Sequence, residues 1–290
     1  MKALIVLAFL ACACDERDPM VRAVTEDPAP DPKFPAAMEP VLIPSGGVSI
    51  NALIYLASGS RAHPAVVFLH GFPGNEQNLD LAQAMRRVGW NVLTLHYRGA
   101  WGSPGTFSFS HAAEDAQAAV AFLRDPANAR RYRVDANKIV VIGHSMGGFL
   151  AANAAGALPE VAGLGVIAAW NIVDDADQWA RASSAKLVDE ATAMRPDTVP
   201  LQGTTAEELI QEAIAHRAEW NFTAHASQIG SRPVLVISTD DGGAAASHAY
   251  VEALRTKARV TEVHFATDHS LSDHRIALHV AVARWLATIR

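Results

Sequence analysis

Short apolar segments alternate along this chain with stretches of helical pattern, and this alternation most narrows what the chain can fold into. Each segment is rich in Val, Ile and Leu, which is typical of strands buried on both faces of a parallel sheet. Between the segments, apolar residues recur every three or four positions, the spacing of amphipathic crossover helices. The alternation predicts an α/β fold with a doubly wound, mostly parallel sheet whose functional residues follow the carboxyl ends of the strands. The predicted strands are AVVFLHG (65–71), NVLTLHY (91–97), KIVVIGHS (138–145), AGLGVIAAW (162–170), PVLVIST (233–239) and VTEVHFA (260–266).

One interval, residues 172–228, is longer than a single crossover helix requires. Insertions of this length in compact domains are usually functional lids or disordered linkers. The interval carries amphipathic stretches together with Trp179 and Trp220, which favours an ordered helical lid. We interpret both tryptophans and Phe222 as packing anchors, since aromatic residues on amphipathic helices more often pack than line a pocket.

The first 14 residues, MKALIVLAFLACAC, have the pattern of a secretory signal peptide: one Lys, an apolar run and small residues at its end. The apolar run is shorter than the roughly 20 residues that a membrane-spanning helix needs. Cys12 and Cys14 each follow an Ala, an arrangement that resembles the lipobox of bacterial lipoproteins. Two interpretations stay open: a lipidated Cys12 or Cys14 tethers the protein to a membrane, or ordinary cleavage removes both cysteines. We therefore expect an exported protein that is periplasmic, membrane-anchored or secreted.

Residues 15–40 are rich in Asp, Glu and Pro, and they carry too little apolar surface to offset the entropy of an ordered chain. We expect a flexible acidic and Pro-rich spacer there, followed by one catalytic domain over residues 41–290 with the lid inserted at about 172–228. The net charge of −6 and the lack of any run of five basic residues disfavour a nucleic-acid partner.

Ser145 stands in the segment GHSMG (143–147), directly after a predicted strand and before a predicted helix. A sharp strand-to-helix turn leaves no room for side chains two residues before and two residues after its apex, where this chain has Gly143 and Gly147. Such a turn exposes the serine Oγ above the sheet. The segment therefore predicts that Ser145 is a nucleophile.

A second glycine-containing segment, HGFPG (70–74), follows the first predicted strand. Acyl transfer needs backbone N–H groups that stabilise the developing oxyanion, and a loop in this place commonly supplies one of them. We assign these donors to Phe72 and to Met146, the residue after the nucleophile. The alternative is an ordinary strand-to-helix turn.

Four segments together resemble the α/β-hydrolase superfamily: HGFPGN, HYRGAWGSPG (96–105), DANKIVVIGHSMGG (135–148) and VLVISTDDG. Within that superfamily the chain leans toward the prolyl oligopeptidase-like and acyl-esterase branch. The resemblance covers about residues 65–290 and implies a sheet of the α/β-hydrolase type with a helical lid insertion. It also implies a catalytic triad of serine, acid and histidine in that chain order.

The acid is expected in the turn after PVLVIST, where Asp240 and Asp241 stand side by side. A carboxylate there would hold the imidazole in the useful tautomer. We interpret Asp241 as the acid and keep Asp240 as the alternative. Whichever aspartate is not the acid is expected to form the turn or cap the next helix.

The base is expected after the last predicted strand, where TDHSLSDHR offers His269 and His274. We choose His269 because it lies at the strand exit, whereas His274 lies further on, inside the predicted terminal helix LSDHRIALHVAVARWLATI. His269, His274 and His279 recur every five residues, which spreads them around a helix and disfavours a zinc site. His70 and His144 flank the predicted site and are expected to support its loops.

These residues predict a serine hydrolase that cleaves carboxylic esters by two-step acyl transfer through an acyl-enzyme on Ser145. Two alternatives stay open, a prolyl oligopeptidase-like peptidase or amidase and a noncatalytic binding protein on a hydrolase fold. The expected partner is a small-molecule ester or a short peptide. No dinucleotide fingerprint follows a strand and no Walker loop occurs, so no cofactor is expected.

Overall fold

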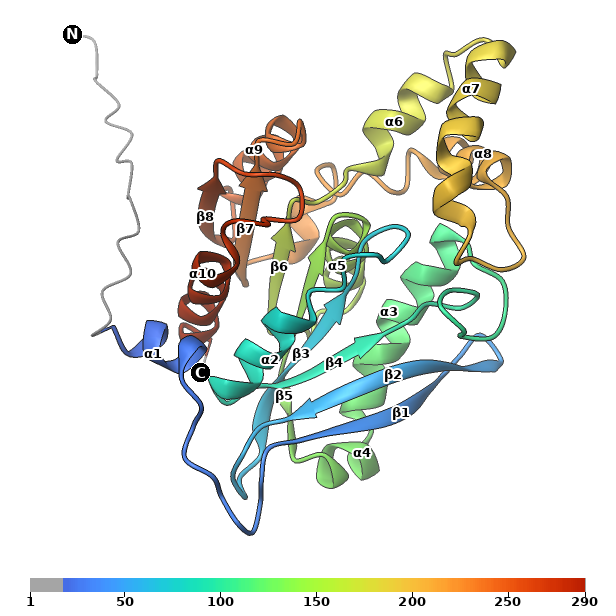
Figure 1. Ribbon diagram of the computed structural model, residues 1–290. Helices are drawn as coiled ribbons and strands as arrows, with labels where there is room; N and C mark the ends of the chain where they lie inside the picture. The colour runs from blue at the N-terminus through green and yellow to red at the C-terminus, as the bar shows by residue number, and fades with distance from the viewer. Residues whose placement is uncertain (1–17, 290) are drawn as a thin grey trace, which may run out of the picture.

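An eight-stranded sheet forms the centre of the computed structural model, which describes residues 18–289 (Figure 1). The strand order is β1-β2-β4-β3-β5-β6-β7-β8. β1 and β2 form an antiparallel hairpin and β2 is antiparallel to β4, whereas the pairs from β4 to β8 are all parallel. The predicted doubly wound, mostly parallel sheet is confirmed. The strands are β1 (Ala37–Ser45), β2 (Val48–Leu56), β3 (His63–Leu69), β4 (Asn91–Leu95), β5 (Val134–His144), β6 (Gly163–Ile167), β7 (Pro233–Thr239) and β8 (Arg259–Phe265).

Helices cover both faces of the sheet, which explains why its central strands are continuous apolar runs. Along β5, Val140 and Ile142 belong to one hydrophobic core cluster, and Val141 between them belongs to the other. The cluster containing Val141 is completed by α3 (Phe109–Arg124), α5 (Met146–Ala157) and α9 (Ala244–Leu254). The opposite cluster is completed by α2 (Leu79–Arg87) and α10 (Arg275–Ala287). A strand between two apolar layers needs apolar side chains at every position.

The predicted spacer is only partly without structure, because residues 19–25 form helix α1 (Pro19–Thr25) and β1 begins at Ala37. Asp18 caps α1, and Val21 and Val24 are buried where the helix packs against α2 and α10. The prediction of a flexible spacer over 15–40 was wrong here, since two valines three residues apart lie on one face of a helix and are buried against α2 and α10. The predicted signal peptide, Cys12 and Cys14 lie outside the described residues.

The interval predicted to be a lid contains three helices, α6 (Ile172–Trp179), α7 (Ser184–Met194) and α8 (Ala206–His216), and two short 3-10 turns, η1 (Arg195–Thr198) and η2 (Ala226–Ile229). In Figure 1 the three helices lie beyond the carboxyl ends of the central strands. The Glu212 carboxylate on α8 accepts hydrogen bonds from the N–H groups of Phe109, at 2.8 Å, and Ser110, at 3.0 Å. It thereby caps the start of α3 and anchors the insertion to the core.

The remaining helix, α4 (Pro126–Arg131), precedes β5. Within residues 18–289, no helix combines the length and the apolar character that crossing a bilayer requires.

Candidate active site

Ser145 lies at the turn between β5 and α5, with φ 57° and ψ −123°. A positive φ is a strained conformation for a residue other than glycine. Backbone hydrogen bonds hold it: the Ser145 N–H donates to the Ile167 carbonyl at 2.9 Å, and its own carbonyl accepts from the Trp170 N–H at 3.0 Å. The serine is therefore fixed between β5 and the end of β6.

The two glycines around Ser145 are required by close backbone packing. A Cβ atom on Gly143 would lie 1.8 Å from the Gly147 carbonyl oxygen, and one on Gly147 would lie 2.0 Å from the Leu69 carbonyl oxygen. Both distances are far inside van der Waals contact. The structure thus gives a steric reason for the spacing of the GHSMG segment.

The loop after β3 passes directly beside Ser145, the predicted nucleophile. A Cβ atom on Gly71 would lie 2.9 Å from the Ser145 Cβ and 3.4 Å from its Oγ. Phe72 follows Gly71, and Met146 is the first residue of α5, whose opening N–H groups have no partner within the helix. Within residues 18–289, the N–H groups of Phe72 and Met146 donate to no protein acceptor. Both of the predicted oxyanion donors are therefore free to bind a ligand.

Side chains from the segment after β4 hold the HGFPG loop in place. The Tyr97 hydroxyl donates to the His70 carbonyl at 2.9 Å, and the Trp101 indole N–H donates to the Pro73 carbonyl at 2.8 Å. His70 is buried, and its Nδ1–H donates to the Gly71 carbonyl at 2.8 Å. Burial lowers the pKa of His70 to about 4, so it is a neutral group that supports the loop.

Asp241 and His269 come together from different loops, those that follow β7 and β8. His269 Nδ1–H donates to the Asp241 carboxylate, which also accepts from the Gly243 N–H at 2.9 Å. Burial raises the pKa of the Asp241 carboxyl, but the hydrogen bonds from His269 and Gly243 outweigh it and bring the pKa below its ordinary value. Asp241 is therefore anionic at neutral pH. Because Nδ1 of His269 carries a proton, its Nε2 is the nitrogen available to accept one.

Asp240, the alternative acid, is directed elsewhere. Its carboxylate is exposed and contacts Nε2 of His264 at 3.1 Å, and His264 in turn contacts the Ser238 hydroxyl at 2.9 Å. His274, the alternative base, contacts Asp273 at 2.8 Å beside the ring of Phe265. The structure thus brings Asp241 and His269 together and separates Asp240 and His274 from them.

Sequence reasoning missed the aromatic side chains next to the nucleophile. Trp170, whose N–H donates to Ser145, lies 6.5 Å from Phe72 and 5.8 Å from Phe109 between ring centroids. The signal was available, because Trp170 is the last residue of the predicted strand 162–170, at the edge of the sheet where functional residues collect. These rings form an apolar wall beside the predicted oxyanion donors.

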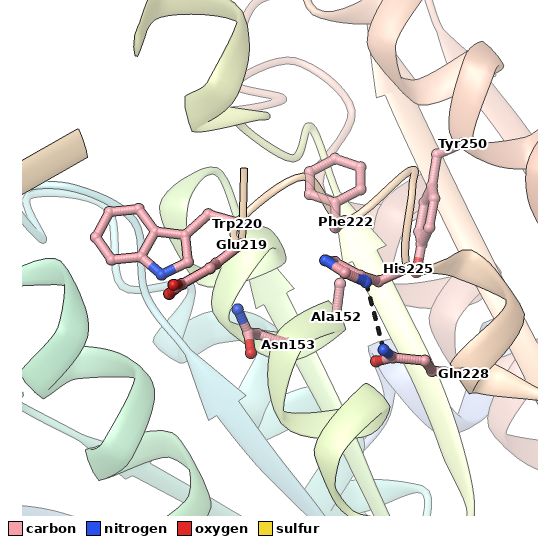
Figure 2. Close-up of a pocket in the computed structure, with 8 residues that line it drawn as sticks. All are labelled: Ala152, Asn153, Glu219, Trp220, Phe222, His225, Gln228 and Tyr250. Atoms are coloured by element: carbon pink, nitrogen blue, oxygen red, sulfur yellow. Dashed lines mark hydrogen bonds between the residues drawn. The ribbon is translucent and has the colours of Figure 1, made fainter. Parts of the chain in front are cut away.

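A cavity of about 250 Å³ lies further along α5, and Figure 2 shows its lining. Ser145 and His269 are not part of it. Trp220, one of the lining residues, has its ring centroid 5.6 Å from that of Phe149 and 6.0 Å from that of Phe109. The lining residues are Ala152, Asn153, Glu219, Trp220, Phe222, His225, Gln228 and Tyr250. Trp179, Trp220 and Phe222 are all buried, but Trp220 and Phe222 also line this cavity.

In the described part of the chain, no group of three or more His, Cys, Asp or Glu side chains is arranged to hold a metal ion. The chemistry available at this edge of the sheet is that of a serine hydroxyl, an imidazole, a carboxylate and two free backbone N–H groups.

Residues 66–281 match the Alpha/beta hydrolase family, and because the match spans well over half of the chain, the protein belongs to that family. Two proteins of Mycobacterium tuberculosis strains, both described as uncharacterized, are 29% identical over 136 residues, which is 47% of this chain and 47% of each relative. The chain thus matches about half the length of these curated relatives.

Solved structures with the same fold include several esterases. The carboxylesterase EstE1 from a metagenomic library is 21% identical with a TM-score of 0.62, covering 93% of both chains. An esterase from the archaeon Pyrobaculum calidifontis is 22% identical with a TM-score of 0.64, covering 93% of this chain and 88% of its own. Est1E of Butyrivibrio proteoclasticus, solved with ferulic acid, is 17% identical with a TM-score of 0.68, covering 86% and 98%. At these identities the likeness establishes the fold.

Proposed function

We propose that the protein is a serine hydrolase that cleaves carboxylic esters through an acyl-enzyme on Ser145. The observation that carries the proposal is the strained Ser145 turn with the hydrogen-bonded pair of Asp241 and His269 at the same edge of the sheet. The names of the similar structures, which include carboxylesterases, support esters as the substrate class.

In the first step, His269 Nε2 takes the Ser145 proton while Oγ attacks the ester carbonyl carbon. The carbonyl oxygen becomes an oxyanion that accepts hydrogen bonds from the Phe72 and Met146 N–H groups. The imidazolium then gives its proton to the departing alkoxide, and the alcohol leaves. In the second step, His269 takes a proton from water, whose oxygen attacks the acyl carbon. The bond between the acyl carbon and Ser145 Oγ then breaks, Oγ takes the proton back from His269, and the acid leaves. Each oxyanion donor is worth about a hundred- to thousand-fold in rate.

The test is turnover of short p-nitrophenyl esters by Ser145→Ala. Turnover should fall by at least about a thousand-fold, because the nucleophile is gone while the fold remains. Ser183→Ala is a matched control, since Ser183 caps α7 and contacts no residue of the site. It should cost about 1 kcal/mol of stability and leave turnover unchanged.

If Ser145→Ala hydrolysed these esters at the wild-type rate, Ser145 would not be the nucleophile. Absence of labelling of the wild-type protein by a fluorophosphonate probe would favour a noncatalytic binding protein instead. Faster cleavage of aminoacyl nitroanilides than of esters would favour the peptidase alternative.

We also propose that the protein is exported, on the strength of the signal-peptide pattern in its first 14 residues. Expression of the full chain in a bacterium, followed by fractionation and palmitate labelling, tests this. Labelling that is lost in Cys12→Ala or Cys14→Ala would identify a lipid anchor, and soluble periplasmic protein would identify ordinary cleavage. Unprocessed protein in the cytoplasm would contradict export.

A further inference from the structure

His144, the last residue of β5, contacts the loop that carries His269. Its Nε2–H donates to the His269 backbone carbonyl at 2.8 Å, and the two imidazole rings lie 4.7 Å apart between centroids. The side chain is buried, with 3% of its surface exposed. The residue covalently joined to Ser145 is therefore also bonded to the backbone of His269.

The protonation state of His144 makes this contact constant around neutral pH. A carbonyl oxygen only accepts, so Nε2 must carry the proton, and Nδ1 is buried with no partner within the described residues. Burial lowers the pKa of His144 to about 4 against the opposing effect of its bond to His269. The titratable groups that act on it are His269, Arg275 and Asp241. His144 is thus a fixed, neutral donor.

The other hydrogen bonds and ion pairs of the 268–275 loop hold it to itself and to the start of α2, and Leu271 is buried in the core cluster that also contains Val140 and Ile142 of β5. Arg275 donates to the Ser270 carbonyl at 2.8 Å and pairs with Asp80 at 2.5 Å. The Ser272 N–H donates to Asp268 at 2.9 Å. None of these hydrogen bonds and ion pairs involves β5 or Ser145. The hydrogen bond between Asp241 and His269 does not involve β5 or Ser145 either. It joins two loops, and the two side chains can shift together.

We propose that His144 is a positioning residue that sets where His269 Nε2 lies relative to Ser145 Oγ. The inference rests on the proposed function. Its physical basis is that proton transfer depends steeply on geometry, and a misplacement of about 1 Å can cost about a hundred-fold in rate. His269 has 44% of its side chain exposed, so packing alone does not fix its position.

The experiment compares His144→Leu, which removes the donor, with His144→Gln, whose amide nitrogen reaches about as far as Nε2. Ester kcat is measured per active site, with sites counted by fluorophosphonate titration. His144→Leu should lower kcat about 10- to 100-fold with less than about a three-fold change in KM. His144→Gln should recover most of the loss.

His63→Leu is the matched control. His63 is also buried, and its ring nitrogens also contact backbone carbonyls, those of Gly89 and Gly59. It opens β3 at the end away from the loop at His70, about 20 Å along the strand. His63→Leu should lower the melting temperature and leave kcat per titrated site unchanged.

A purely structural role would lower the number of titratable sites in His144→Leu while leaving kcat per site at the wild-type value, and that result would overturn the proposal. Equal losses in the Leu and Gln variants would overturn it as well. If His144→Leu does not fold, His144→Asn replaces it. The Asn amide is too short to reach the His269 carbonyl, so this variant should show the same loss.

Ser145→Ala is assayed in parallel. If it stays active, the proposed function fails. If it is inactive and the His144 variants are unchanged, only the positioning role is removed.

Discussion

The two sides of the candidate site are held in different ways. The nucleophile side, Ser145 with Phe72 and Met146, lies at the ends of the central strands β3 and β5, and Ser145 is only 9% exposed. The base side, Asp241 and His269, lies on loops after β7 and the edge strand β8, and it is joined by side-chain hydrogen bonds. Backbone packing therefore determines the first side, and contacts between distant loops determine the second. His144, on β5, connects the two sides because its Nε2–H donates to the His269 carbonyl.

The largest effect is expected from a methyl group on the nucleophile side. Gly147→Ala would place its Cβ 2.0 Å from the Leu69 carbonyl oxygen, and neither backbone can move without breaking the sheet. We expect a loss of more than about 4 kcal/mol in unfolding free energy, together with loss of activity. Denaturant unfolding measures the first and ester turnover the second.

Gly243→Ala is the counterpart on the base side. Its φ is −82° and its Cβ would meet the Asp241 Oδ1 at 3.3 Å, a contact that a side chain can relieve. Stability should change by less than about 1 kcal/mol. Equal destabilisation by the two alanines would show that backbone packing constrains both sides alike.

The second effect distinguishes the two neighbouring aspartates. Asp241→Asn removes the charge that orients His269, and kcat should fall about ten-thousand-fold, as loss of a triad carboxylate does elsewhere. Asp240→Asn, which loses only an exposed contact to His264, should change kcat by less than about three-fold. The opposite ranking of the two variants would assign the acid to Asp240.

The third effect is acid destabilisation through the buried histidines beside the nucleophile. His70 and His144 each have a pKa of about 4 in the fold, below the ordinary value of 6.5. Between these values the unfolded chain binds more protons, so the stability that each contributes is complete above pH 6.5 and is lost as the pH falls toward 4. The loss should reach about 3 kcal/mol for each histidine.

Unfolding free energies measured from pH 7 to pH 4 test this linkage. His144→Gln cannot titrate in this range, so its stability should depend less on pH than that of the wild type. Asp241 behaves differently because its pKa is lowered below 3.8, and its contribution is lost only at still lower pH. Parallel pH curves for the wild type and His144→Gln would contradict the buried neutral state.

The same difference explains how much of the site could be predicted from the sequence. The nucleophile side follows from a local steric rule, because Gly143 and Gly147 are needed wherever a strand turns this sharply into a helix. Asp240 and Asp241 cannot be told apart locally, since both are carboxylates in one turn. Residues far along the chain distinguish them: Asp240 contacts His264 on β8, whereas Asp241 accepts a hydrogen bond from His269.

Helix α1 and Trp101 show the same limit. Val21 and Val24 alone are too few to reveal a helix face in the sequence, and only their packing against α2 and α10, far along the chain, makes them part of the core. Trp101 stands in a glycine-containing loop, where nothing in the sequence shows that its indole reaches back to Pro73. Contacts between segments far apart in the chain leave little trace in local patterns.

The smallest effect expected is on the support of the HGFPG loop. Trp101→Phe keeps a ring but removes the N–H that donates to the Pro73 carbonyl, next to Phe72. Trp101 is 39% exposed, so water can replace the lost donor, and the cost should be about 1 kcal/mol, or about five-fold in kcat with little change in KM.

Trp90→Phe is the matched control, because the Trp90 indole N–H is buried with no partner among residues 18–289. It should lower stability without lowering kcat. If Trp101→Phe instead lowers kcat as strongly as Asp241→Asn does, then the nucleophile side depends on side-chain contacts as much as the base side, and the contrast between them disappears.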